Sequence, residues 1–178
     1  MKQRYDGDYD DHLTNQGRRD AEEIASKLAD SKISHIFYSS KIRARETADI
    51  LKEKLHCETS VIPDMDEQNI YGAYAVLGKE QPEEEYRKLG ELMTNRENAM
   101  DGVESYRQFK TRILDSFSEI LKKYTNNVAI VTHGGPIRCI LRENFKKDDL
   151  KKIGNGAIIE LEKNDSEIKI LKMDGVVV

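Results

Sequence analysis

The sequence is short of cysteine and of long apolar runs. Two of its 178 residues are cysteines, Cys57 and Cys139, and they show no metal-ligand spacing. This scarcity excludes a disulfide-rich secreted scaffold and is typical of ordinary thiols in a reducing compartment. No apolar run is long enough to cross a membrane, and the opening MKQRYDGDYDDH lacks the apolar segment of a signal peptide. We therefore expect a cytoplasmic protein without a membrane partner.

A concentrated block of positive charge is also missing. Lysine and arginine number 29 against 33 aspartates and glutamates, which leaves a net charge of −4. A mildly acidic chain without a basic cluster argues against nucleic acid as the main partner. The length predicts a single domain, residues 1–178, that can bury its own core. No pattern in the sequence indicates an oligomeric state.

What the chain does contain is an alternation of strand-like and helix-like segments. Helical periodicity begins at Thr14 or Asn15, and three further helices are expected over residues 42–55, 101–124 and 135–145. Pro82 suits the first turn of another helix, which would run to about residue 93. Short strands rich in β-branched and aromatic residues are expected within residues 32–40, 59–65 and 127–133.

This alternation predicts a particular fold class. Strands that alternate with helices favour a mostly parallel sheet with helices on both faces, a three-layer α/β/α architecture. Residues 156–173 read as a terminal hairpin with an Asn-Asp turn, which we expect to add an antiparallel edge to the sheet.

The clearest candidate for chemistry is His133, which lies between a buried strand and a new helix in VTHGGPIR. In open α/β sheets, ligands bind beyond the carboxyl ends of the strands. The two glycines let the backbone approach a ligand closely, and Pro136 suits a helix start. A histidine at this point can donate a hydrogen bond to an anion or carry a proton. The alternative is a structural histidine that caps its own helix, but residues on loops at strand ends are often functional.

A second strand end, YSSKIRARETA, places Arg43 in the first turn of a helix. The start of a helix offers backbone N–H groups and a partial positive charge, both of which suit an anion. The planar guanidinium of Arg43 matches phosphate or carboxylate. Taken alone, Arg43 supports only the interpretation of an ordinary surface arginine on an amphipathic helix, because arginines are common there.

A third candidate is the acidic stretch DMDEQNIYGAY, which follows a predicted strand. Asp64, Asp66 and Glu67 could each supply a general acid, because a nearby bound anion favours the protonated form of a carboxyl group. The alternative is a solvated acidic loop. The remaining histidines are interpreted as structural or surface residues: His12, His35 and His56.

Four segments, in this order, together resemble the histidine phosphatase superfamily, also called phosphoglycerate-mutase-like. DDHLTNQGRRDAEEIASKL resembles the D-x-LT-x-x-G helix start of that family. SSKIRARETA resembles its S-P-L-x-RA-x-x-TA segment, with Ser40 and Lys41 in place of Pro-Leu. GVESYRQFKTRI is similar to its GES segment, and VAIVTHGGPIR is similar to its second histidine motif. Each match is weak by itself, and their order along the chain makes the set specific.

The resemblance implies a reaction and a set of roles. In this family one histidine attacks phosphorus, a second histidine and two arginines hold the phosphate oxygens, and a carboxylate protonates the leaving oxygen, without a metal or other cofactor. Arg43 matches the second phosphate-binding arginine and His133 the second histidine, with the N–H of Gly134 also facing the phosphate. Glu67 is the expected acid, although its spacing to the following glycine is one residue longer than usual. Asp66 stays open as the alternative.

The first motif of the family, an apolar strand ending in Arg-His-Gly, is missing. It should shortly precede DDHLT, where the chain reads MKQRYDGDYD; Gln3 and Arg4 would fall just after the missing glycine, and His12 occupies a variable position. That strand is central in the family's sheet, and burying about five apolar side chains contributes roughly 10 kcal/mol. We expect a truncated reading frame from an active enzyme. The alternative is a variant that binds phosphate-bearing ligands without catalysis.

The resulting hypothesis is a metal-independent phosphomonoesterase that acts on a small phosphorylated substrate through a phosphohistidine. A mutase of the same family is the rival enzyme. Residues 64–100 form a connecting segment that is too short to shield a bound reaction intermediate from water. This favours hydrolysis over mutase activity. Sugar phosphates, phosphoglycerates, nucleotides, cofactor precursors and phosphoproteins are all left open as substrates.

Overall fold

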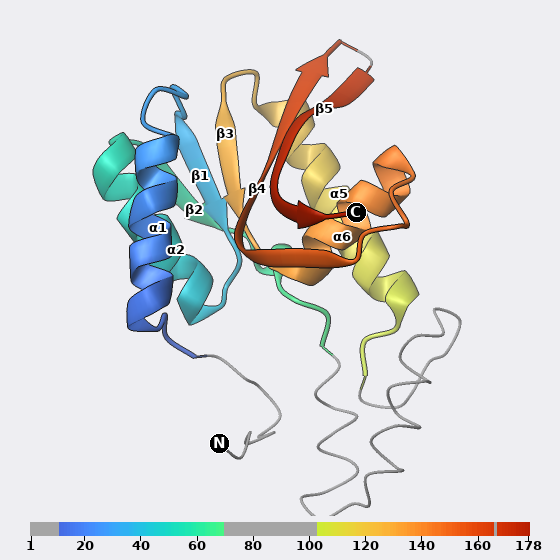
Figure 1. The fold of residues 1–178 in the computed structure, drawn as a ribbon. Helices are drawn as coiled ribbons and strands as arrows, with labels where there is room; N and C mark the ends of the chain where they lie inside the picture. The colour runs from blue at the N-terminus through green and yellow to red at the C-terminus, as the bar shows by residue number, and fades with distance from the viewer. Residues whose placement is uncertain (1–10, 70–102, 166) are drawn as a thin grey trace, which may run out of the picture.

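The computed structural model describes residues 11–69, 103–165 and 167–178 (Figure 1). The helices are α1 (Asn15–Lys27), α2 (Ile42–Leu55), α5 (Tyr106–Lys123) and α6 (Gly134–Phe145), with a 3₁₀ turn η1 (Pro63–Met65). The strands are β1 (His35–Tyr38), β2 (Glu58–Val61), β3 (Val128–Val131), β4 (Lys152–Asn164) and β5 (Glu167–Val177). The helix predicted for residues 82–93 lies outside the described residues.

The first three strands form the predicted parallel sheet, in the order β2-β1-β3. The central strand ends in register with both neighbours, because Tyr38 lies opposite Val61 on one side and Val131 on the other. The segments that follow these strands therefore leave the sheet at one edge. All the residues proposed from the sequence to carry chemistry lie in those segments.

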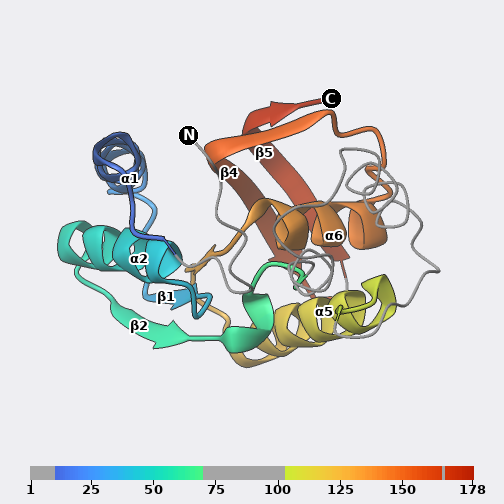
Figure 2. The same cartoon turned by 90° about the horizontal axis from the view of Figure 1, so that it is seen from below.

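Helices cover both faces of this sheet, as the three-layer prediction requires. The α1–α2 pair packs on one face, where Ile36 is buried beside Ala48 and Leu51. The α5–α6 pair packs on the other, where Phe37 is buried among Ile113 and its neighbours. Figure 2 shows one helix pair on each side. Successive residues of a strand point to opposite faces, so Ile36 and Phe37 serve different layers.

Two helix starts follow directly from local sequence. Thr14 caps α1 by accepting a hydrogen bond on its hydroxyl from the N–H of Gly17 at 3.1 Å. Ser105 and Gln108 form a reciprocal capping box at the start of α5. The apolar stripe predicted for this helix is confirmed, with four residues buried and Leu121 partly buried. The buried members are Phe109, Ile113, Phe117 and Ile120.

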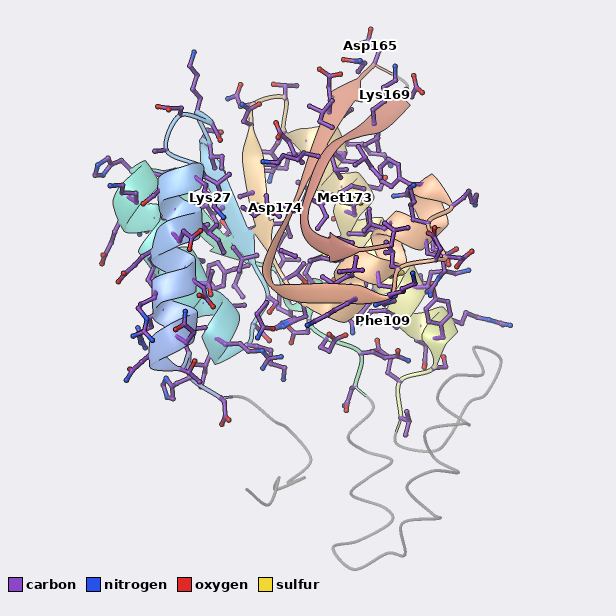
Figure 3. All side chains as sticks on the ribbon, in the orientation of Figure 1. Lys27, Phe109, Asp165, Lys169, Met173 and Asp174 are labelled. Carbon is purple, nitrogen blue, oxygen red and sulfur yellow. The ribbon has the colours of Figure 1, made fainter. Side chains whose placement is uncertain are left out.

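The terminal hairpin is confirmed, but its predicted place in the sheet is wrong. The prediction placed the hairpin at the edge of the parallel sheet. In the described part of the chain, β4 and β5 instead form a separate two-stranded sheet. Side-chain packing holds it instead: Leu161 packs against the α5–α6 core, and Gly156 lies against Ile24 of α1. Lys27 of α1 also approaches Asp174 of β5, with 3.7 Å between Nζ and Oδ2 (Figure 3).

Strand β3 is less covered than β1, although both are short and apolar. All four of its residues are only half-buried, whereas Ile36 and Phe37 of β1 are buried. The reason is its place in the sheet, since β3 pairs only with β1 among the described strands. None of the described helices is long and apolar enough to cross a membrane.

Candidate active site

His133 is the N-cap residue of α6 and is nearly buried, with 9% of its surface exposed. Its Nε2 atom lies 2.6 Å from the hydroxyl of Ser39, a fully buried residue that follows β1. Its Nδ1 atom lies 3.1 Å from Nη2 of Arg43 on α2. The ends of β1 and β3 therefore meet through this imidazole.

These contacts indicate which tautomer a neutral ring adopts. A guanidinium can only donate hydrogen bonds, so Nδ1 must accept from Arg43 and carries no proton. The proton of the neutral imidazole then sits on Nε2, which donates to the Ser39 hydroxyl. Arg43 thus sets the tautomer of a neutral His133, and Ser39 helps to orient the ring. Nothing in the sequence pattern YSSKIRARETA had marked this role of Ser39.

Arg43 lies in the first turn of α2 and is half-buried. Neither Lys41, the N-cap of α2, nor His133, the N-cap of α6, caps its own helix with a side-chain hydrogen bond. Two helix N-termini, each with the positive end of its dipole, thus begin beside the Arg43–His133 contact. This arrangement suits an anion with several oxygens, such as a phosphoryl group.

The three acidic candidates differ in the groups that they contact and in their exposure. Glu67 points toward α6, and its Oε2 accepts a hydrogen bond from the N–H of Gly135 at 3.0 Å. Asp66 points the other way, and its carboxylate accepts from the N–H and hydroxyl of Ser40 at 2.6 and 2.5 Å. Asp64 is exposed. Glu67 is therefore the carboxylate that reaches the helix of His133, whereas Asp66 braces the start of α2.

The two glycines after His133 have different surroundings. A Cβ atom added at Gly135 would lie 1.8 Å from Oε1 of Glu67, so the close approach of this carboxylate requires glycine. A Cβ added at Gly134 would meet no atom of the described residues within 4 Å. The N-terminal turn of α6 thus uses Gly135 for Glu67 and leaves open space beside Gly134, the glycine expected to face phosphate.

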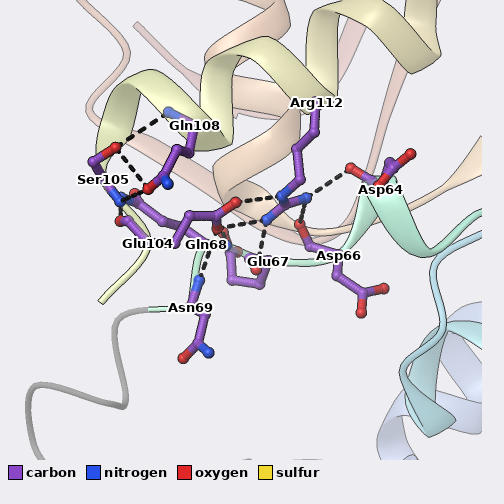
Figure 4. A network of polar contacts seen from close by, with 9 residues as sticks. All are labelled: Asp64, Asp66, Glu67, Gln68, Asn69, Glu104, Ser105, Gln108 and Arg112. Atoms are coloured by element: carbon purple, nitrogen blue, oxygen red, sulfur yellow. Dashed lines mark hydrogen bonds and ion pairs between the residues drawn. The ribbon is translucent and has the colours of Figure 1, made fainter. Parts of the chain in front are cut away.

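The loop that carries Asp66 and Glu67 is itself held by Arg112 and Glu104 (Figure 4). Arg112, on α5, donates to backbone carbonyls of the loop and binds Glu104 through two nitrogens. The sequence analysis missed both residues. A usable signal was the position of Glu104 in the GES-like segment, whereas nothing marked Arg112 among the charged residues of α5.

The other three histidines lie away from this site, as predicted. His12 contacts Glu46, whose pKa falls to about 2 because it accepts hydrogen bonds from His12 and from the backbone before α1. His35 contacts Ser60 and packs against aromatic rings. His56 ends α2 in a left-handed conformation.

The two cysteines are free thiols, which agrees with their sequence-based interpretation. Cys57 is half-buried, and Cys139 is fully buried within α6, where burial raises its pKa to about 11. A thiol with a raised pKa is a poor nucleophile at neutral pH. Among the described residues, no three or more histidine, cysteine and acidic side chains are grouped so that they could hold a metal ion.

A family model of the histidine phosphatase superfamily (branch 1) matches residues 1–174. This chain belongs to that superfamily. The chain is 26% identical over 144 residues to the Bacillus subtilis (strain 168) protein described as "Uncharacterized phosphatase PhoE", covering 80% of this chain and 69% of that protein. It is 28% identical over 139 residues to "Phosphoglycerate mutase-like protein 4" of Arabidopsis thaliana, covering 75% of this chain and 60% of that protein.

A solved structure agrees with the fold. Bacillus stearothermophilus YhfR superposes with a TM-score of 0.75 at 19% identity, covering 95% of this chain and 87% of that one. At this identity the likeness shows the fold alone. The predicted phosphoglycerate-mutase-like α/β fold is thereby confirmed, and the superfamily points to a phosphorylated small molecule as the ligand.

Proposed function

We propose that this chain carries the phosphate-holding part of a phosphomonoesterase that works through a phosphohistidine. His133 is its second histidine, Arg43 and the N–H of Gly134 hold phosphate oxygens, and Glu67 is the acid. The observation that carries this proposal is the meeting of Arg43, His133 and two helix N-termini at one sheet edge. The free thiols are in keeping with a reducing compartment such as the cytoplasm.

The chemistry assigns each group one task. A nucleophilic histidine forms an N–P bond while the P–O bond of the ester breaks, and Glu67 gives its proton to the departing oxygen. Water then attacks the phosphohistidine and gives a proton to the Glu67 carboxylate, so inorganic phosphate leaves and the nucleophile is restored. Arg43 and His133 stabilise the charge on the phosphoryl oxygens throughout.

The nucleophile belongs to an Arg-His-Gly strand that the sequence does not contain, because none of its four histidines is preceded by arginine. We propose that turnover requires this strand. The half-buried state of β3, which pairs only with β1 in the described residues, supports a further strand beside it. The alternative is a phosphate-binding protein without catalysis.

A phosphatase assay with p-nitrophenyl phosphate separates these possibilities. We expect no turnover from the chain as given, and turnover once an apolar strand ending in Ile-Arg-His-Gly is joined before Met1. Binding of inorganic phosphate by both proteins without turnover by either supports the non-catalytic alternative. In the restored enzyme, His133→Ala should lower kcat/KM roughly 10²- to 10³-fold. Full activity of that variant would overturn the assignment of His133.

A mutase is the second candidate, because one curated relative is named as phosphoglycerate mutase-like. A mutase returns the phosphoryl group to a second hydroxyl, whereas a phosphatase gives it to water. Incubation of the restored enzyme with 3-phosphoglycerate separates them. We expect free phosphate, and formation of 2-phosphoglycerate without phosphate release would favour the mutase.

A further inference from the structure

We propose that Arg112 is a positioning residue that holds Glu67 at the N-terminus of α6. It does so through the backbone of the loop that carries Glu67, and Glu104 keeps its guanidinium in place. Arg112, Glu104 and the backbone of residues 64–67 form what is called the clamp below. Its functional meaning rests on the proposed role of Glu67 as the acid. The clamp itself rests on contacts that can be tested without turnover.

Every N–H group of the Arg112 guanidinium has a partner (Figure 4). The Nε and Nη2 atoms bind the two oxygens of Glu104 at 2.5 and 2.8 Å, which forms a two-pronged ion pair. Nη1 donates to the carbonyls of Asp64 and Asp66 at 2.6 and 2.8 Å. Nη2 also donates to the carbonyl of Glu67 at 3.1 Å. A guanidinium has five donors, and all five are used.

The loop depends on these donors because it lies beyond the end of β2. The carbonyl oxygens of residues 64 to 67 all accept hydrogen bonds from side chains of other elements. Three of them accept from Arg112, and that of Met65 accepts from the Thr132 hydroxyl at 2.6 Å. Asp66 and Glu67 are half-buried, and carbonyls in such places need partners, so Arg112 defines where this backbone can lie.

Glu104 fastens the same loop from the other side. Its carboxylate accepts from the N–H of Asn69 at 3.1 Å, and its own N–H donates to the Asn69 carbonyl at 3.0 Å. Its carbonyl accepts from the side-chain amide of Gln68 at 3.0 Å. The Arg112 and Glu104 side chains are 21% and 16% exposed, and the guanidinium lies 4.9 Å from the centre of the Phe109 ring. This shielding makes the pair stronger and more rigid than a surface ion pair.

The position of Glu67 follows from the clamp. Its carboxylate spans from the clamped backbone to the N–H of Gly135 on α6, where no Cβ could fit. A small shift of the loop would therefore break this hydrogen bond. Lysine could not replace Arg112, because an ammonium group is a compact charge with three donors and cannot reproduce the planar fork.

The Gly135 amide reports directly on this arrangement in the chain as it stands. We would measure its proton chemical shift and its hydrogen exchange by NMR. Arg112→Lys should move this resonance upfield and raise its exchange rate roughly 10- to 100-fold, as expected from losing one hydrogen bond to a charged group. Arg107→Lys is the matched control, since Arg107 is an exposed arginine on the same helix.

A double-mutant cycle tests whether Arg112 acts through Glu67. In a Glu67→Ala background, Arg112→Lys should no longer change the Gly135 amide. An equal change in both backgrounds, or no change in either, would overturn the proposal. If Arg112→Lys fails to fold, Glu104→Gln loosens the clamp from its other partner and should give the same pattern.

A purely structural role would give a different result. Ile113→Val removes a buried methylene group from the same helix and removes none of the hydrogen bonds to the loop. In Ile113→Val, the exchange rate of the Gly135 amide should rise only as much as the loss of global stability predicts. In Arg112→Lys, the rate should rise more than the loss of global stability predicts. Because neither phosphate nor turnover enters these measurements, a failure of the proposed function leaves their outcome intact.

Discussion

Helices α1 and α5 begin with their own side-chain caps, whereas α2 and α6 do not. Thr14 and Ser105 accept hydrogen bonds from the first turns of α1 and α5. The residues in the same place before α2 and α6 are Lys41 and His133, and neither makes a side-chain capping bond. The capped helices are closed locally, and the other pair depends on groups brought from elsewhere in the fold.

The capped starts of α1 and α5 contribute to stability, whereas the starts of α2 and α6 are available for function. Helices α2 and α6 both follow strands of the parallel sheet, so their positive ends gather at its carboxyl edge. The carboxylates that meet them come from one loop: Asp66 binds Ser40 just before α2, and Glu67 binds Gly135 of α6. A helix start that is not closed by its own cap can respond to an anion.

The largest effect is expected when the carboxylate at α6 loses its acid function. In the strand-restored enzyme, Glu67→Gln should lower kcat roughly 10²- to 10⁴-fold for an alkyl phosphate, whose leaving oxygen needs a proton. The loss should be much smaller for p-nitrophenyl phosphate, because p-nitrophenolate leaves without one. Steady-state kinetics with both substrates provides the check. Equal losses on the two would assign Glu67 a different role.

The glycines of α6 offer a matched pair. Gly135→Ala should destabilise the protein by about 1–3 kcal/mol, because the new methyl group collides with Glu67. The new methyl group of Gly134→Ala meets no atom within 4 Å in the described part of the chain, so this change should be neutral or stabilise by up to about 1 kcal/mol through helix propensity. Urea denaturation measures both free energies of unfolding. Equal effects would mean that Glu67 does not approach Gly135 in solution.

Removal of the local helix caps should have a smaller effect on the free energy of unfolding. Thr14→Ala and Ser105→Ala should each lower the free energy of unfolding by about 1 kcal/mol, since each exposes a first-turn N–H group without a partner. Denaturation midpoints at constant slope provide the measurement. Phosphate binding should be unchanged in both variants. A loss of binding comparable to that in Arg43→Ala would contradict the division between the two kinds of helix start.

The smallest effect concerns the segment before α1. Hydrogen bonds from His12 and from the N–H of Leu13, with the charge of Arg18, lower the pKa of Glu46 from 4.5 to about 2. A lowered folded-state pKa stabilises the protein above pH 4.5, and this stability is lost as the pH falls toward 2. Glu46→Gln should therefore flatten the pH dependence of unfolding in that range. An unchanged profile would contradict the pairing.

The local elements could be predicted because their signals lie within a few residues. Thr14 and the Ser105–Gln108 pair mark helix starts through contacts three residues apart. The Asn164–Asp165 pair marks the hairpin turn, and the structure extends both of its strands beyond the predicted range. The parallel sheet followed from the alternation of elements. The predicted position of the hairpin was wrong, because apolar packing rather than strand pairing holds it.

The site was predictable in part. Arg43 and His133 stand at strand ends, and parallel strands bring such ends together, so their proximity followed from fold class. Glu67 and Asp66 were not separable from the sequence, since they are neighbours in one acidic loop. Their side chains take opposite directions because Ser40 and Gly135 lie on opposite sides of that loop. The catalytic role of Glu67 stays a prediction.

The sequence by itself determined the order of elements, their caps and the strand ends at which chemistry could occur, because these depend on local hydrogen bonds and on periodic burial. The tertiary structure alone decided which carboxylate approaches His133 and what holds it there. Arg112 reaches the backbone carbonyls of residues 64, 66 and 67, more than forty positions away. Every residue has a carbonyl, so no side-chain pattern marks such a partner, and only folding brings the two segments together.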